Sequence, residues 1–172
     1  AAAELRGIQT ANLKIFEANN YDYLLARMAE SEGDKATAIA NYKTVADRDS
    51  ILKAYALFHL AKIFRESGNL LLERLYLTKL SIESPTSLLM PATRERLAKS
   101  SFAASNFAET IRMLTSDNFG ITGDKTNAAV SRFLREDNAL LAAAYLRHGQ
   151  TGTAREIFVR LRQYDTHATP RE

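Results

Sequence analysis

The stretch that decides the fold is Gly33 to Ser50, which reads GDKATAIANYKTVADRDS. It begins with a glycine, which can end a preceding helix in the left-handed conformation. The aspartate that follows can cap the next helix. Small and aliphatic residues then recur at helical spacing, with Tyr42 halfway along. The stretch therefore predicts a tight turn followed by a packed helix.

Three later segments repeat this order of residues. Each opens on Gly or Ser, continues with Asn or Gln, and carries a large apolar residue nine positions after the opener. The openers are Gly33, Gly68, Ser105 and Gly149, and the apolar residues are Tyr42, Leu77, Leu114 and Phe158. Successive openers are 35, 37 and 44 residues apart, close to the roughly 34-residue period of helix–turn–helix repeats.

The segments upstream of the openers also match one another. Each contains a Leu-Ala pair seven to eight residues before its opener. These pairs are Leu25-Ala26, Leu60-Ala61, Leu97-Ala98 and Leu141-Ala142. A small residue lets the two helices of a hairpin cross closely, and its large neighbour fills the space alongside.

The composition also favours helices over sheets, because seven Gly and three Pro are too few for the turns of a sandwich or barrel. We therefore expect an all-α fold.

The pattern resembles the tetratricopeptide repeat (TPR) family and the looser TPR-like superhelices, over residues 20–165. Pro85, which ends the second repeat, lies where that family usually has a proline, and Ala38 and Ala154 keep its small residue in the second helix. Glu73 and Thr110 depart from that preference. The resemblance implies a right-handed superhelix, or solenoid, of about four hairpins plus an N-terminal helix. It also implies a non-catalytic scaffold that binds a protein or peptide on its concave face.

The predicted organisation is one repeat domain over residues 1–172. It comprises an N-terminal helix at 1–19, repeats at 20–50, 51–86, 87–117 and 125–165, an inserted loop at 116–125 and a tail at 166–172. A single helix over 2–18 should cover the first repeat. A long helix is expected from about Thr126 to Arg147, because apolar residues recur on one face there.

Several classes of function lack support in the sequence. There is no Cys, and His59, His148 and His167 have no partners at metal-ligand spacing, so neither a metal nor a cofactor is expected. A net charge of +3 without a basic block argues against nucleic acid binding. No apolar run is long enough to span a membrane, and the first residues lack the features of a signal peptide.

Catalysis by this chain alone is also not expected. Glu66-Ser67 and the SLLMP segment at 87–91 superficially resemble lytic transglycosylase motifs, but the Glu ends a repeat helix and the segment lacks the flanking Gly and Gln. We interpret both as structural. Activity of residues 1–172 on glycan strands would be the evidence for the alternative, an enzyme in its own right.

Basic residues follow the small Ala in three of the four first helices. They are Arg27, Lys62 and Lys99, with Tyr23 and Phe58 one turn before the first two. If these helices line a concave face, cations and aromatics would form a ladder suited to a carboxylate-bearing peptide or an anionic polymer. The full predicted partner-binding set is Tyr23, Arg27, Tyr55, Phe58, Lys62, Arg65, Lys99 and Phe102. The alternative is that these are ordinary solvated charges.

The alanine-rich hairpins also resemble the helical superhelix that precedes the catalytic domain of bacterial soluble lytic transglycosylases. That resemblance implies a periplasmic or cell-envelope location and peptidoglycan as a possible partner. The alternative is a free-standing TPR adaptor or assembly protein of the bacterial envelope or the cytoplasm.

Overall fold

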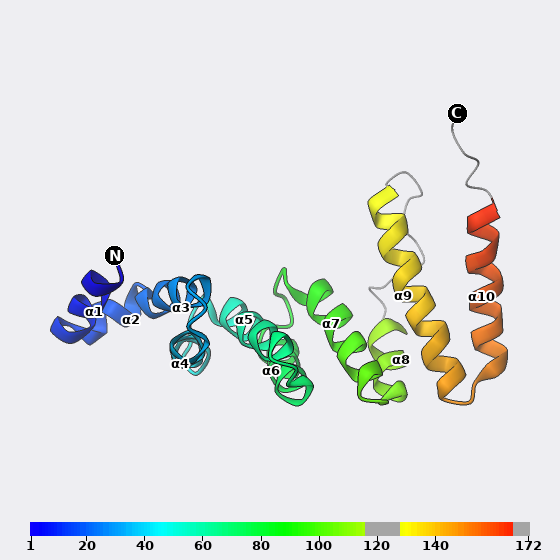
Figure 1. Cartoon of the computed structure of the whole chain (residues 1–172), viewed down its shortest axis with the longest axis horizontal. Helices are drawn as coiled ribbons and strands as arrows, with labels where there is room; N and C mark the ends of the chain where they lie inside the picture. The colour runs from blue at the N-terminus through cyan, green and yellow to red at the C-terminus, as the bar shows by residue number, and fades with distance from the viewer. Residues whose placement is uncertain (116–127, 167–172) are drawn as a thin grey trace. The chain divides into compact units, whose positions relative to one another are not determined.

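The computed structural model describes residues 1–115 and 128–166, and within these ranges every regular element is an α-helix (Figure 1). The elements are α1 (Ala2–Ala11), α2 (Leu13–Ala18), α3 (Tyr21–Ser31), α4 (Lys35–Ala46), α5 (Lys53–Glu66), α6 (Leu70–Glu83), α7 (Met90–Ala103), α8 (Phe107–Thr115), α9 (Ala128–Arg147) and α10 (Thr151–Thr166). No helix of this part of the chain has the length and apolarity needed to cross a bilayer.

The helices pair as hairpins, which confirms the prediction of an all-α helical repeat. Within the first repeats α3 packs on α4 and α5 on α6, and α4 also packs on α5. Towards the C-terminus α8 packs on α9, and α9 on α10. The chain was predicted as one domain, and its contacts divide it into two compact units, residues 1–93 and 94–172, which we describe separately. The predicted loop at 116–125 lies outside the described residues.

Buried alanines mark the first helix of every hairpin, as the sequence predicted. Ala26, Ala61, Ala98 and Ala142 are fully buried, and the Leu before each is at most 8% exposed. The second helices place a small or polar side chain in their first turns, and Ala38, Glu73, Thr110 and Ala154 are all buried. The Thr110 hydroxyl lies 3.3 Å from the carbonyl oxygen of Ala98, so in that hairpin a polar contact joins the two helices.

The turns between paired helices follow one geometry. Gly33, Gly68 and Gly149 have φ of 80°, 74° and 87°, the left-handed conformation that ends a helix. Ser105 takes the same region with φ of 59°. The residue after the opener caps the next helix in three hairpins. The carboxylate or amide oxygens of Asp34, Asn69 and Asn106 accept backbone N–H bonds at 3.0, 3.1 and 3.2 Å.

The N-terminal segment differs from its prediction as a single helix over 2–18. The helix breaks at Asn12, whose φ of −155° is extended, and whose side chain accepts a hydrogen bond from the Ile15 N–H at 3.1 Å. Asparagine competes with helical hydrogen bonding through such local contacts. As a result α1 and α2 are separate helices, and α2 contributes the buried Phe16 to the core.

A buried ion pair ties the start of α3 to the loop after α4, and sequence analysis did not anticipate it. The guanidinium of Arg48 forms a bidentate pair with Asp22, whose side chain is 1% exposed. Arg48 also donates to the Asn20 side chain at 2.9 Å and to the Glu17 carbonyl at 3.1 Å. These bonds satisfy a charge that would otherwise be costly to bury, and they fix the position of the α4–α5 connection.

The turn glycines give a direct test of the repeat geometry. Gly68→Ala should lower the free energy of unfolding by about 1 kcal/mol. The added Cβ would meet no atom within 4 Å, but the alanine backbone would have to adopt a positive φ, which L side chains disfavour. Gly7→Ala is the control, since Gly7 is helical with equally open surroundings, and it should raise stability by up to about 1 kcal/mol. Urea unfolding followed by circular dichroism measures both; equal losses would contradict the assigned turn.

Candidate functional site

Two of the predicted cations meet at one carboxylate in the first unit. Arg27 of α3 and Lys62 of α5 both donate to Glu30 of α3, at 3.2 Å to Oε2 and 2.9 Å to Oε1. The hydroxyl of Tyr42, from α4, donates to Glu30 Oε2 at 2.6 Å. We call the group formed by Arg27, Glu30, Tyr42, His59 and Lys62 the Glu30 cluster. It joins three consecutive helices at the point where the second hairpin packs on the first.

His59 of α5 completes the cluster through its ring. The imidazole stacks on the Tyr42 ring with centroids 5.0 Å apart and 7° between the planes, and Tyr23 packs edge-on against both rings. Nδ1 lies 2.9 Å from Glu30 Oε2, and Nε2 lies 3.0 Å from Arg27 Nη1. A neutral ring with its proton on Nδ1 satisfies both contacts, because Nδ1–H donates to Glu30 and Nε2 accepts from Arg27. The prediction of a packed histidine therefore understated its polar role.

The electrostatics of the cluster favour an ionised Glu30 and a neutral His59. Burial works against the charged carboxylate, but hydrogen bonds from Tyr42 and Lys62 hold the pKa of Glu30 below its usual range. Burial lowers the pKa of His59, and the nearby charges of Arg27 and Lys62 lower it further against the opposing pull of Glu30. Burial, together with the hydrogen bond to Glu30, raises the pKa of Tyr42. At neutral pH one carboxylate is thus shared by two cations.

The other predicted residues of the first unit lie in different settings. Tyr55 is 40% exposed, and Arg65 is also exposed. Phe58 is half-buried against the hydrophobic core. The aromatic rings beside the ion pairs are those of Tyr23, Tyr42 and His59. Sequence reasoning missed Glu30 and Tyr42. The available signal was the spacing of Glu30 three residues after Arg27, which places both on one helical face.

Lys99 and Phe102 belong to the second unit, on α7. The Lys99 ammonium pairs with Glu95 one turn earlier, and the Phe102 ring packs edge-on against Phe107 of α8 with centroids 5.4 Å apart. The Glu95 hydrogen bond raises the pKa of Lys99. That Arg27, Lys62 and Lys99 line one concavity, and that the predicted set binds a partner, both stay predictions.

A buried carboxylate faces this part of α7 from α9. Asp137 is 5% exposed, and among the described residues neither of its carboxylate oxygens has a hydrogen-bond partner. Burial raises its pKa to about 6, helped by the charges of Glu95 and Glu136 and opposed by Lys99. In the second unit, acidic groups therefore surround the cation Lys99, whereas in the first unit two cations surround the carboxylate of Glu30.

Glu66, Ser67 and the two remaining histidines were not expected to carry chemistry. Glu66 ends α5 and is exposed, with its carboxylate 3.8 Å from Lys62, and the Ser67 hydroxyl donates to the Ile63 carbonyl at 2.9 Å. His148 is exposed after the end of α9, and His167 lies outside the described residues. Among the described residues, no group of three or more His, Cys, Asp and Glu side chains is placed to hold a metal ion.

The Glu30 cluster predicts an asymmetric response to loss of charge. Glu30→Gln should lower the free energy of unfolding at pH 7 by about 1–2 kcal/mol, because it leaves two cations with a poorer acceptor. Glu66→Gln, which also removes an acidic partner of Lys62 but at an exposed site, should cost less than about 0.5 kcal/mol.

Acidification should reduce the difference between the stability losses of Glu30→Gln and Glu66→Gln. The pKa of Glu30 is lowered in the folded state, so its stabilisation is present above its ordinary value and is lost as the pH falls through the folded value. Urea unfolding of wild type and both variants at pH 7 and pH 3.5 measures this. A Glu30→Gln penalty that does not change with pH would contradict the assigned ion pairs.

Neutralising Asp137 should have the opposite effect on stability to neutralising Glu30. Asp137→Asn should raise the free energy of unfolding at pH 7 by about 1 kcal/mol, because it removes a buried charge that lacks hydrogen bonds. Since the pKa of Asp137 is raised to about 6 in the folded state, wild type loses this penalty as the pH falls below that value. The gain should be present at pH 7.5 and absent at pH 4; Glu136→Gln, next to it but exposed, is the control.

Comparison with known proteins places the fold. No protein-family profile matches the chain, and no curated protein matches it. A similar solved structure is the crystal structure described as "Podosopora anserina putative kinesin light chain nearly identical TPR-like repeats". The likeness covers 98% of this chain and 95% of that one, with a TM-score of 0.60 and 16% sequence identity.

An identity this low shows the fold and not the function. The comparison gives no support to the resemblance to lytic transglycosylases. Together with the buried alanines and left-handed turns, it identifies the architecture as an all-α, TPR-like helical repeat.

Proposed function

We propose that this chain is a non-catalytic helical-repeat scaffold that binds a carboxylate-bearing protein segment on the face formed by α3 and α5. The proposal is carried by one observation: Arg27 and Lys62, from successive first helices, converge on Glu30 while keeping 48% and 41% of their side chains exposed. TPR-like repeats generally bind protein partners, and stacked hairpins offer an extended surface for this.

The Glu30 cluster supports such binding by fixing its cations in place. The Glu30 side chain is only 13% exposed, so it holds the two cations from beneath while their outer sides face solvent. The contacts of Arg27 with Glu30 and His59 all use Nη1, and a guanidinium has further donors that suit a carboxylate. Because Arg27 and Lys62 are already ordered, the protein loses less side-chain conformational entropy when a ligand binds.

Exposed residues beside the cluster extend the surface. Tyr55 lies close enough to Tyr23 to interact electrostatically with it, and Arg65 stands three residues beyond Lys62 on the same helix. An aromatic face and a third cation are suited to a peptide carrying both apolar and acidic side chains. A partner identified by its carboxylates is therefore favoured over a neutral one.

The cellular location of the scaffold does not affect the proposed binding surface. A periplasmic place beside a transglycosylase domain, with peptidoglycan as the polymer, rests on the sequence resemblance alone. A free-standing adaptor rests on the same repeats. The proposed surface is common to both.

Peptide binding tests the proposal. Fluorescein-labelled acidic octapeptides with a free carboxyl terminus should bind the full chain, and their amidated or Gln-substituted forms should bind at least about 10-fold more weakly, since a charge-assisted hydrogen bond contributes about 1.5–3 kcal/mol. Fluorescence anisotropy at 50 and 300 mM salt measures affinity, which should fall as salt rises.

Variants separate the surface from the stability of the fold. Tyr55→Ala and Arg65→Ala leave the Glu30 hydrogen bonds intact and should each weaken binding several-fold, and Arg27→Gln with Lys62→Gln should abolish it. Lys43→Ala, an exposed cation on α4, is the matched control and should bind normally. Equal affinity for the acidic and Gln-substituted peptides, or equal loss with Lys43→Ala, would refute the proposed surface.

A further inference from the structure

The last hairpin exposes a face that the first unit keeps covered. Phe158 on α10 holds the same place after its opener as Tyr42 does on α4, and Leu146 on α9 holds the place of Glu30 on α3. Tyr42 is fully buried, whereas Phe158 is 43% exposed. In the first unit this face is covered by α5, which packs on α4 and brings His59 and Lys62 onto Tyr42 and Glu30.

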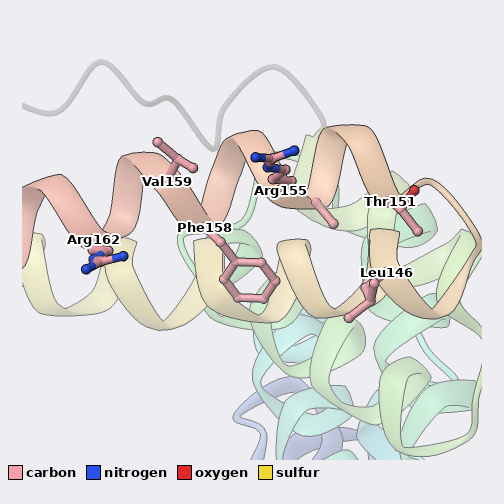
Figure 2. Close-up of a pocket in the computed structure, with 7 residues that line it drawn as sticks. Leu146, Thr151, Arg155, Phe158, Val159 and Arg162 are labelled. Carbon is pink, nitrogen blue, oxygen red and sulfur yellow. The ribbon is translucent and has the colours of Figure 1, made fainter.

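A groove lies where the covering helix would be. It has a volume of about 330 Å³ and is formed by residues of α10 and the end of α9, as Figure 2 shows. Its lining includes Leu146, Ala154, Arg155, Phe158, Val159 and Arg162. Leu146 and Val159 are 50% and 49% exposed, so three large apolar side chains form one open surface within the second unit.

The charged side chains that line this groove, Arg155 and Arg162, are both positive. Arg155 and Arg162 flank Phe158 on α10, three residues before it and four after it, and therefore share its face. Within the described residues neither guanidinium is paired with a carboxylate. The two lie seven residues apart, which is about 10.5 Å along a helix. An apolar strip between these two cations complements an apolar strip between two acids.

We propose that this face is a docking site for an acidic amphipathic helix of a partner protein. The helix would lie along α10 as α5 lies along α4, with its apolar side on Leu146, Phe158 and Val159. Acidic residues at positions i and i+7 would pair with Arg155 and Arg162, and apolar residues at i+3 and i+4 would enter the groove, because these positions share one face of a helix. This site is distinct from the α3–α5 surface, so either can fail without the other.

A designed peptide tests the site on the full chain. The probe is an alanine-based helix of about 18 residues with Glu at i and i+7 and Leu at i+3 and i+4, stapled on the opposite face because short helices are marginal in water. One control peptide carries Lys in place of both Glu, and another carries Ser in place of both Leu. Fluorescence anisotropy should show the Glu-Leu peptide binding at least 10-fold more tightly than either control.

Variants of the chain give the decisive comparison. Phe158→Ala should weaken binding at least 10-fold, as expected for a ring that becomes buried on binding. The double variant Arg155→Glu with Arg162→Glu should reverse the preference and bind the Lys peptide more tightly. Leu71→Ala, which removes a 70%-exposed apolar side chain from α6, should leave binding unchanged, and thermal melting checks that each variant is folded.

Three results would overturn the proposal. The first is no binding of the Glu-Leu peptide at concentrations up to about 1 mM. The second is affinity that is unchanged in the Phe158 variant or not reversed by the charge exchange. The third is a dimer in sedimentation equilibrium that Phe158→Glu dissociates, which would assign the face to a second copy of this chain.

Discussion

The fold depends on close approach of helices at a fully buried alanine. Ala26, Ala61, Ala98 and Ala142 each lie in the first helix of a hairpin, followed at fixed spacing by a residue in the left-handed conformation. The small side chain sets how near the second helix can come, and the turn sets its direction. A larger residue at any of these positions would separate the pair, because a close-packed interior has no room for it.

Contact between hairpins follows a different rule from contact within them. Inside the first unit, the second hairpin is joined to the first by apolar burial and by the Glu30 cluster, in which Tyr42 of α4 and His59 and Lys62 of α5 meet Glu30 of α3. A carboxylate that is only 13% exposed is costly to leave without its donors, so the cluster favours one register of the two hairpins. The same cations face solvent, and in this way the packing of the repeat also orders its exposed surface.

Much of the fold could be predicted from the sequence because it is set by local spacing. The Leu-Ala pairs, the openers and the capping Asp34, Asn69 and Asn106 hold fixed positions relative to one another within their hairpins, and each acts within a few residues. The break at Asn12 was missed because one asparagine in an amphipathic segment is a weak signal. The contacts of Glu30 with Tyr42 and Lys62, and that of Arg48 with Asp22, were missed because they join different elements, 12, 32 and 26 residues apart, and spacing within one helix cannot reveal them.

The buried Asp137 has a consequence for how the chain opens. A repeat protein unfolds in parts, and the least stable hairpin opens most often. As the pH falls, protonation of Glu30 and His59 destabilises the first unit, whereas protonation of Asp137 removes the cost of a buried charge in the second. Acid therefore acts in opposite directions on local opening in the two units, promoting it in the first and opposing it in the second.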